Sequence, residues 1–330
     1  MSAIAVWAEV SEGRYKKPTL EALTLTRQWA DSLGLPVWAV VIGKELPTDS
    51  QQVLGDYGAD RLISILDPQL EPFVNSAYAR ALSELIQQKA IRYIVIPQSY
   101  NGRAVAPLVA IWADAALFSG IIGVPEKEGE GFKARRIAYS NKGFEWVYTA
   151  HLPLIVTLKA NAIVPAKNSR TPEQESFSFS PKAEDLRLKP IRVEKIATDK
   201  VPLTEAEIVV SGGRGLKGPE NWKIIEELAQ VLGAATACSK PVADIGWRPH
   251  HEHVGQTGIQ ISPNLYVAIG ISGAIQHLAG VASSKNILVI NNDAEAPFFK
   301  VADYGIIGDA FEVVPRLTEA IRKYKAQHSH

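Results

Sequence analysis

The first half of the chain alternates short apolar runs with longer segments of helical period. Four runs rich in β-branched residues are separated by segments in which apolar residues recur every three or four positions. This order of strand, helix, strand, helix is typical of a parallel sheet covered by helices. We expect strands at residues 4–8, 37–42, 61–65 and 93–96, and helices at residues 19–33, 49–57, 75–88 and 103–115.

After residue 119 the pattern changes to strands without intervening helices. Three β-rich runs, at residues 134–139, 145–150 and 154–160, are separated only by short polar turns. This spacing favours a β-meander appended to the sheet. Residues 165–202 then carry several prolines, serines and charges, a composition typical of a linker between domains.

From residue 206 the alternation of strands and helices resumes. We expect strands at residues 207–210, 265–269, 287–290 and 304–307, and helices at residues 219–232 (ending at Gly233), after Gly273, near residues 296–301 and at residues 311–325. At about 150 residues per domain, 330 residues suggest two domains. The chain is therefore predicted to form two doubly wound, Rossmann-like α/β domains with parallel sheets, residues 1–195 with appended β-hairpins and residues 196–330.

Composition narrows the functional classes. Lys plus Arg and Asp plus Glu both number 35, so the net charge of zero provides no field that would attract nucleic acid or an anionic membrane. The single cysteine, Cys238, excludes an intrachain disulfide, and with seven scattered histidines it provides no structural zinc pattern. These features are typical of a reducing compartment.

No targeting or membrane segment is expected. The N-terminus lacks the basic region of a secretory signal and the Arg/Ser richness of a transit peptide. Residues 104–124 and 265–282 carry almost no charge, but the first contains Pro107 and Asp114 and the second is rich in glycine and polar residues. We expect a cytoplasmic protein without a membrane span, or one from the mitochondrial matrix if a transit peptide has been removed.

The first candidate for chemistry is a glycine-rich turn. Gly213, Gly215 and Gly218 match G-x-G-x-x-G between an expected strand and an expected helix, where N–H groups can approach a pyrophosphate. The next strand ends in Cys238-Ser239-Lys240, without the acidic residue that would bind the ribose of a nicotinamide dinucleotide. Two interpretations stay open, a nucleotide-binding turn and a plain connection.

A second glycine turn lies in residues 265–277. A buried strand runs through Gly270 into a helix, which places Ser272 and several free N–H donors at the helix start and His277 about a turn and a half later. Such a start stabilises a phosphate or an electron-rich ring edge. One alternative is a buried turn with a satisfied histidine. Another is a nucleophile elbow, since Gly270-x-Ser272-x-Ala274 resembles one, although the chain offers no well-placed base after it.

Two shorter patterns are ambiguous. Residues 254–258 form a Val-Gly-Gln-Thr-Gly turn in which two glycines bracket Gln256 and Thr257, and an ordinary loop would have the same composition. Three histidines and a glutamate within residues 250–253 could be read as metal ligands. Three histidines so close rarely share one tetrahedral ion, so a polar loop is favoured.

These patterns occur together and in order, and residues 291–309, Asn-Asn-Asp-Ala-Glu-Ala-Pro-Phe-Phe-Lys-Val-Ala-Asp-Tyr-Gly-Ile-Ile-Gly-Asp, follow them. The chain resembles the electron-transfer flavoprotein alpha subunit. The resemblance is dense from residue 206 to residue 321, and residues 265–280 look like the family signature. The N-terminal half fits more loosely, through its α/β layout and length.

The resemblance implies an electron carrier rather than a stand-alone enzyme. The carrier would be a heterodimer in which the N-terminal domain of alpha contacts a homologous beta subunit, the C-terminal domain holds one FAD, and beta holds AMP. Flavin dehydrogenases, such as the acyl-CoA dehydrogenases of fatty acid β-oxidation, would reduce the FAD. A membrane quinone oxidoreductase would reoxidise it.

The resemblance also assigns cofactor contacts by position. Thr257 would bond the ring atom N5, His277 would donate toward O2, and Arg214 would approach the phosphates or the ring. Asn291 and Asp309 would hold the adenosine portion. The full expected FAD-binding set is Arg214, Ser239, Lys240, Val254, Gly255, Gln256, Thr257, Ser272, Gly273, Ala274, Ile275, Gln276, His277, Asn291 and Asp309.

One position departs from the family pattern. Where the family usually has Ser-Arg, with the guanidinium packed on the flavin, this chain has Ser239-Lys240. Lysine keeps the charge but loses planar stacking and the fixed fork of donors. We therefore expect altered one-electron potentials of the flavin.

Two alternative functions stay open. A flavin oxidoreductase with its own small substrate would need an acid or base over the ring, and the sequence offers none beyond His277. A flavin-bifurcating complex would carry an additional flavin mainly in the beta subunit, which the alpha sequence alone does not reveal.

Overall fold

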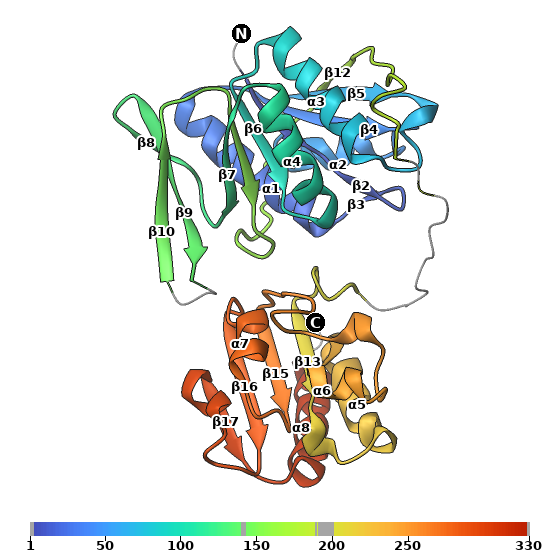
Figure 1. The fold of residues 1–330 in the computed structure, drawn as a ribbon, viewed down its shortest axis with the longest axis vertical. Coiled ribbons are helices and arrows are strands. Elements are labelled where there is room, and N and C mark those ends of the chain that lie inside the picture. The colour runs from blue at the N-terminus through green and yellow to red at the C-terminus, as the bar shows by residue number, and fades with distance from the viewer. Residues whose placement is uncertain (1–2, 140–142, 189, 191–200, 329–330) are drawn as a thin grey trace. The chain divides into compact units, whose positions relative to one another are not determined.

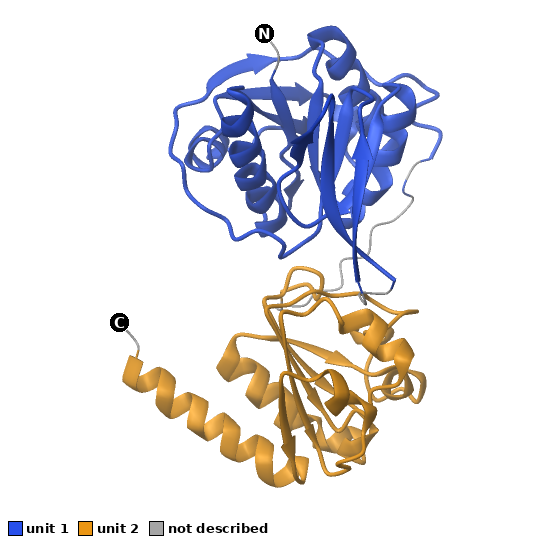
Figure 2. Cartoon of the chain, turned by 90° about the vertical axis from the view of Figure 1, so that its left-hand side faces the viewer, with its two compact units in different colours: residues 1–139, 143–195 blue, residues 140–142, 196–330 orange. Residues whose placement is uncertain are grey.

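The computed structural model describes residues 3–139, 143–188, 190 and 201–328. Within them the chain divides into two compact units (Figure 2), unit 1 with residues 3–139, 143–188 and 190 and unit 2 with residues 201–328. The expected boundary between residues 195 and 196 lies outside the described residues.

A ten-stranded, mostly parallel sheet forms the centre of unit 1 in the described part of the chain (Figure 1). The strand order is β10-β9-β7-β11-β6-β1-β4-β5-β12, and β8 pairs with β9. The strands are β1 (Ile4–Trp7), β4 (Val37–Gly43), β5 (Arg61–Leu66), β6 (Tyr93–Pro97), β7 (Ala116–Ile121), β8 (Glu126–Glu128), β9 (Gly131–Ala138), β10 (Gly143–Thr149), β11 (Leu154–Leu158) and β12 (Glu173–Ser176). A short antiparallel pair, β2 (Val10–Ser11) and β3 (Arg14–Tyr15), lies outside this sheet.

Helices cover both faces of this sheet, because successive residues of its central strands point to opposite sides. In β1, Ile4 and Val6 share a core with α1 (Lys17–Leu33) and α2 (Ser50–Asp56). Ala5 and Trp7 share the opposite core with α3 (Asn75–Lys89) and α4 (Tyr100–Trp112). Both faces of β1 are buried, as is typical of a central parallel strand, so unit 1 is doubly wound.

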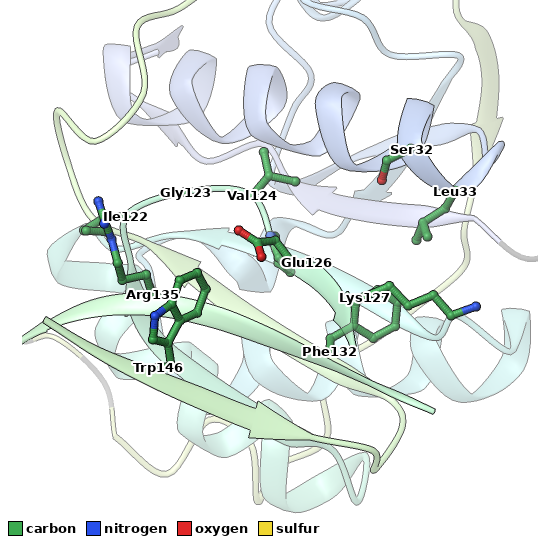
Figure 3. Close-up of a pocket in the computed structure, with 11 residues that line it drawn as sticks. Ser32, Leu33, Ile122, Gly123, Val124, Glu126, Lys127, Phe132, Arg135 and Trp146 are labelled. Atoms are coloured by element: carbon green, nitrogen blue, oxygen red, sulfur yellow. The ribbon is translucent and has the colours of Figure 1, made fainter. Parts of the chain in front are cut away.

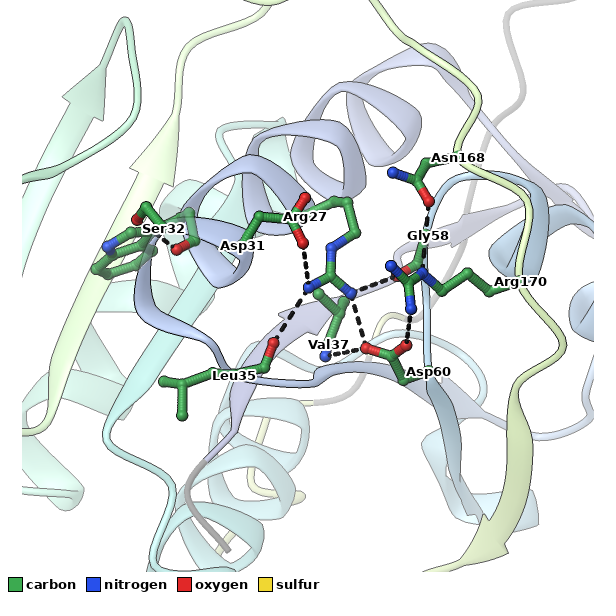
Figure 4. A network of polar contacts seen from close by, with 10 residues as sticks. Arg27, Asp31, Ser32, Leu35, Val37, Gly58, Asp60, Asn168 and Arg170 are labelled. Carbon is green, nitrogen blue, oxygen red and sulfur yellow. Dashed lines mark hydrogen bonds and ion pairs between the residues drawn. The ribbon is translucent and has the colours of Figure 1, made fainter.

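A buried arginine fixes the helix that covers one face. Arg27 of α1 donates from Nη1 to the Asp60 carboxylate (2.7 Å) and from Nη2 to the Leu35 carbonyl (3.1 Å). The same carboxylate accepts the N–H of Val37 (2.8 Å) and an Nη1 donor of Arg170 (3.2 Å), as Figure 4 shows. One charged pair therefore ties α1, the start of β4 and the chain beyond β11 together.

Two expectations for unit 1 are wrong. Residues 154–160 do not extend a meander: β11 lies parallel between β6 and β7, and the antiparallel strands are β8, β9 and β10. Of the expected linker, residues 165–202, the part up to residue 188 belongs to unit 1. Strand β12 pairs with β5 at the sheet edge, and Phe177 and Phe179 are buried. Further along that range, residue 189 and residues 191–200 lie outside the described residues.

Unit 2 contains an all-parallel sheet of five strands among the described residues, in the order β14-β13-β15-β16-β17. The strands are β13 (Ile208–Gly212), β14 (Ala235–Cys238), β15 (Leu265–Ile269), β16 (Asn286–Asn291) and β17 (Tyr304–Ile307). Helices α5 (Lys223–Leu232), α6 (Lys240–Asp244) and α8 (Ala310–His328) pack on one face. Helix α7 (Ile275–Val281) and the 3₁₀ turn η5 (Pro297–Val301) pack on the other.

The predicted fold class is confirmed, since both units are α/β with parallel sheets. Helix α5 ends at Gly233, which has the left-handed φ of 70° that the prediction required. Near residues 296–301, where a helix was expected, Pro297–Val301 forms a 3₁₀ turn rather than an α-helix. The remaining 3₁₀ turns are η1 (Pro68–Leu70), η2 (Arg214–Leu216), η3 (Pro219–Trp222) and η4 (His250–Glu252).

The strand order of unit 2 creates one topological switch point. From β13 the chain crosses to β14 on one side, and then returns to β15 on the other side of β13. In open parallel sheets a crevice forms at such a point, outside the carboxyl ends of the two strands. Residues directly after β13 and β15 therefore occupy the position at which this architecture binds ligands.

Candidate functional site

Two glycine turns meet at this switch point. The Gly215 N–H donates to the Gly270 carbonyl (3.1 Å), and Gly270 has a φ of 61°. A Cβ on Gly215 would lie 2.7 Å from the Gly270 Cα, and a Cβ on Gly213 would overlap the Gly270 carbonyl oxygen. The close approach of the two turns therefore requires glycine at these positions.

Backbone donors are available where the second turn enters α7. Among the described residues, the N–H groups of Ser272, Gly273, Ala274 and Ile275 have no carbonyl acceptor. Gly273 holds the turn with a φ of 83° directly against Phe298. Ser272, Ala274 and Ile275 are exposed, so these donors lie at an open edge and fit the oxygens of a phosphate or diphosphate.

Arg214 adds a cation beside the same turns. It lies between Gly213 and Gly215, its side chain is exposed, and it makes no ion pair with any residue that the structure describes. A guanidinium with free donors binds phosphate oxygens in a bidentate manner. The first predicted turn therefore combines a backbone that a ligand can approach closely with a positively charged side chain.

The turn at residues 254–258 packs on α7. The Gln256 N–H donates to the Gln276 carbonyl (2.7 Å), and a Cβ on Gly280 would lie 2.5 Å from the Gly255 Cα. Gln256 and Thr257 are exposed. The structure thus brings two of the sequence-predicted segments, this turn and the start of α7, side by side.

His277 is buried beneath these segments. Its Nε2 lies 2.8 Å from the hydroxyl oxygen of Tyr266 on β15, and its Nδ1 has no hydrogen-bond partner among the described residues. The ring also packs edge-on against Phe298, with centroids 5.8 Å apart. Burial, together with the nearby His253, lowers the pKa of His277 to about 4, so the imidazole is neutral at physiological pH.

The end of β14 completes the carboxyl edge. Ser239 is buried, and its N–H donates to the Gly212 carbonyl (3.1 Å), which joins this strand end to that of β13. Lys240 is exposed and donates to Asp244 one helical turn later (2.6 Å). The hydrogen bond from Lys240 lowers the pKa of the Asp244 carboxyl.

Asn291 and Asp309 use their side chains within the protein. The Asn291 amide is buried and donates to the Ile271 carbonyl (3.1 Å), which supports the second glycine turn. The Asp309 carboxylate accepts the Phe311 N–H (2.7 Å) and caps the start of α8. Their expected contacts with adenosine stay predictions.

Three buried side chains at the site were not among the predicted site residues. Tyr266 and Phe298 contact His277, and His253 lies under Gly258, where an added Cβ would meet its ring. Tyr266 carried a usable signal, because a tyrosine in a buried strand needs a partner for its hydroxyl. The partner itself is not visible in the sequence, since it depends on how α7 packs on β15.

Neither a metal site nor a membrane helix is found in the described ranges. No group of three His, Cys, Asp or Glu side chains there is placed to hold a metal ion, and His250 and His251 are exposed. In the same ranges no helix combines the length and hydropathy needed to cross a membrane.

Unit 1 contains a separate cavity of about 740 Å³ (Figure 3). It lies between the end of α1 and strands β8, β9 and β10, with Trp146 and Arg135 on one side and Leu33 on the other. None of the sequence-predicted site residues lines it.

Comparison with known proteins gives a match over most of the chain. The electron transfer flavoprotein domain matches residues 4–182, and the electron transfer flavoprotein FAD-binding domain matches residues 202–282. The chain belongs to the electron transfer flavoprotein alpha family. The FAD-binding match includes both glycine turns, the Gln256 turn and His277, whereas Asn291 and Asp309 follow it.

Curated relatives of the family align along nearly the whole chain. Electron transfer flavoprotein subunit alpha of Bacillus subtilis is 37% identical over 322 residues, which cover 97% of each chain. The subunit alpha of Thermoanaerobacterium thermosaccharolyticum is 36% identical and covers 98% of each chain. Protein FixB of Clostridium saccharobutylicum is 33% identical and covers 94% of each chain.

The residues of unit 2 fit the flavin cofactor of this family. Glycines that could not carry a Cβ bring two backbone turns together, exposed N–H groups suit the diphosphate, and the buried Nδ1 of His277 lacks a partner. The expected family membership is thus confirmed, and the individual contacts of the predicted site residues stay predictions.

Proposed function

We propose that this chain is the alpha subunit of a heterodimeric electron carrier and holds one FAD outside the carboxyl ends of β13 and β15. The observation that carries the proposal is the contact of two glycine turns at the switch point of unit 2, within the FAD-binding match. A carrier of this kind has no substrate turnover of its own.

Each part of the site has a role toward the cofactor. The bound flavin supplies the redox chemistry, because its ring accepts and releases electrons. The N–H groups of Ser272 to Ile275 and the Arg214 guanidinium bind the diphosphate. Thr257 donates toward N5 and His277 toward O2, where negative charge gathers when the ring is reduced. The exposed Gln256 turn and α7 orient the ring.

The partners follow from the same proposal. A homologous beta subunit, which carries AMP, contacts unit 1. The relatives named subunit alpha support the heterodimer, since they align with the chain over 97% and 98% of their length. Flavin dehydrogenases, acyl-CoA dehydrogenases among them, deliver the electrons, and a membrane quinone oxidoreductase receives them.

The test is co-expression with the beta homologue, followed by the flavin-to-heterodimer ratio and absorption spectra during stepwise reduction. One FAD per heterodimer, reduced in two separate one-electron steps without turnover of a small substrate, supports the proposal. Two FAD per heterodimer would identify the bifurcating alternative. Steady turnover of a small molecule by the two subunits would identify an oxidoreductase, and absence of flavin would overturn the site.

A further inference from the structure

The turn that carries Gln256 and Thr257 is built against a buried side chain. His253, directly before the turn, is buried, whereas Gln256 and Thr257 at its tip are exposed. A Cβ on Gly258 would lie 2.7 Å from His253 Nδ1, and a Cβ on Gly255 would lie 3.2 Å from His253 Nε2. The two glycines that bracket the tip therefore both pack on the imidazole ring.

The backbone around His253 closes the same turn. The His253 carbonyl accepts the Ile259 N–H (2.9 Å) just after the turn. The Val254 N–H donates to the Cys238 carbonyl at the end of β14 (3.0 Å). Backbone bonds thus hold both ends of the turn, and the imidazole is the side chain against which its two glycines lie.

The His253 ring is neutral at physiological pH. Burial lowers its pKa and the nearby Lys240 lowers it further, so only acid pH protonates the ring. Asp244 has the opposite effect, but its carboxylate is bonded to Lys240 (2.6 Å). The titratable and charged side chains on the surrounding elements are Lys240 and Asp244 of α6, His250 and Glu252 of η4, Cys238 of β14, and His277 of α7.

Protonation would place a charge on this ring without a free partner in the described part of the chain. Neither ring nitrogen has a hydrogen bond there, and the two nearby carboxylates are already paired. Glu252 accepts two bonds from Arg248 (2.6 and 2.7 Å), and Asp244 is held by Lys240. Because a buried charge without a partner is costly, the protonated ring must move toward water or toward a carboxylate. Either movement takes it away from the two glycines.

We propose that His253 is a positioning residue whose neutral ring supports the turn that presents Gln256 and Thr257 to the flavin, and whose protonation withdraws that support. The contact of Gln256 and Thr257 with flavin rests on the proposed function, whereas the packing of the turn on the ring is a property of the chain itself. A neutral side chain of similar length at position 253 should therefore hold the turn at every pH, and a small one should not.

The first test measures how fast FAD leaves the two-subunit complex after dilution, from the fluorescence of released flavin, between about pH 7.5 and about pH 5. We expect the wild-type rate to rise at least about tenfold as the pH falls. His253→Gln should match wild type at neutral pH and show no rise, and His253→Ala should release FAD faster already at neutral pH. The control, His250→Gln, removes an exposed histidine three residues earlier and should keep the wild-type rise.

The second test follows the turn without flavin. In the flavin-free complex with ¹⁵N-labelled threonine, the Thr257 amide signal is assigned by its loss in Thr257→Ser. In wild type this signal should shift over the same pH range, and in His253→Gln it should stay in place. A flavin-free complex that shows this difference supports the inference even where FAD is never bound, in which case the proposed function fails separately.

Three outcomes overturn the inference. These are the same pH profile of FAD release in wild type and His253→Gln, an unchanged release rate in a folded His253→Ala, and a Thr257 signal whose response to pH does not depend on His253. If His253→Ala does not fold, the two comparisons with His253→Gln decide.

Discussion

At the scale of single residues, the expected departure of Lys240 from the family pattern stays a prediction that can be tested. Its ammonium is half exposed and bonded to Asp244, so its charge is directed along α6. A guanidinium at this position would add a planar cation that can stack on a flavin ring.

Lys240→Arg is therefore expected to raise the midpoint potential of the bound flavin. A cation stacked on the ring is worth about 0.5–2 kcal/mol, which corresponds to about 20–80 mV for one electron. A redox titration of the complex measures the shift. Asp244→Asn is the matched control, because it releases Lys240 from its pair without changing it. Identical potentials in wild type and Lys240→Arg would show that position 240 does not contact the ring.

Burial of neutral His277 makes the stability of unit 2 depend on pH. Its pKa is about 4 in the folded chain and about 6.5 when unfolded, so between these values the unfolded chain binds more protons. The free energy of unfolding should fall as the pH drops from about 6.5 to about 4, by about 3 kcal/mol in total.

Urea unfolding across this pH range, compared with His277→Gln, measures that contribution. The variant should lose most of the slope and keep the part from His253, whose pKa burial also lowers. Equal slopes for the two proteins would mean that His277 is protonated in the folded state.

At the scale of elements, the site depends on turns that need glycine for two separate reasons. Gly270 and Gly233 both have left-handed backbone angles, with φ of 61° and 70°. Only Gly270 has another backbone at contact distance, since a Cβ there would lie 2.9 Å from the Gly215 Cα, whereas Gly233 is open.

The two glycines form a matched pair of variants. Gly233→Ala should cost about 1 kcal/mol, the conformational penalty alone. Gly270→Ala should cost about 2–4 kcal/mol and release the flavin, because the two turns must separate. Unfolding curves and flavin content measure both effects. Full flavin retention in Gly270→Ala would contradict the assigned site.

The Arg27 network predicts a large effect in unit 1. Arg27→Met leaves the Asp60 carboxylate without its closest cation (2.7 Å) and the Leu35 carbonyl without its donor. We expect a loss of about 3 kcal/mol in unfolding free energy. Lys167→Met, which removes an exposed pair with Asp56, should cost below about 1 kcal/mol. Comparable losses would mean that the Arg27 pair is worth no more than a surface pair.

The sequence predicted the positions of helices and strands better than it predicted which strands lie next to each other in the sheet. Continuous apolar runs mark central parallel strands, so β1, β4 and β6 were located within a residue or two. The run in β11 looks the same as that of a meander strand, because strand order depends on long-range packing rather than local pattern. Strand β12 (Glu173–Ser176) is polar, and ion pairs with Arg61 and Lys89 hold it at the sheet edge. Because its composition is polar, it resembled a linker in the sequence.

The candidate site was also predictable only where its residues have a local sequence signature. Glycine turns have a local signature, so Gly213, Gly215 and Gly270 were identified from spacing. The contact between Tyr266 and His277 was not, because it forms only when α7 packs on β15. The roles of Asn291 and Asp309 in supporting a turn and capping a helix also depend on the folded backbone.

At the scale of the whole molecule, each unit has its own cores. Two of the buried clusters consist of residues from unit 1 and two of residues from unit 2. Each unit thus has the apolar core that independent cooperative unfolding requires.

Calorimetry of the chain should therefore show two transitions. FAD at about 100 times its dissociation constant should stabilise one of them by about 2.7 kcal/mol, and that transition belongs to unit 2. Arg27→Met should lower the other. A single transition that responds to both changes would show that the units unfold together.

The position of β11 has a consequence for synthesis on the ribosome. Its neighbours β6 and β7 both precede it in the chain, and β7 reaches the rest of the parallel sheet only through β11. As the chain emerges, the side of β6 that later pairs with β11 stays without a partner strand. Strand β7 and its attached hairpin strands also cannot join the parallel sheet until residue 158 has left the exit tunnel. A chaperone that shields exposed strand edges would therefore act on this chain during the interval between translation of β6 and of β11.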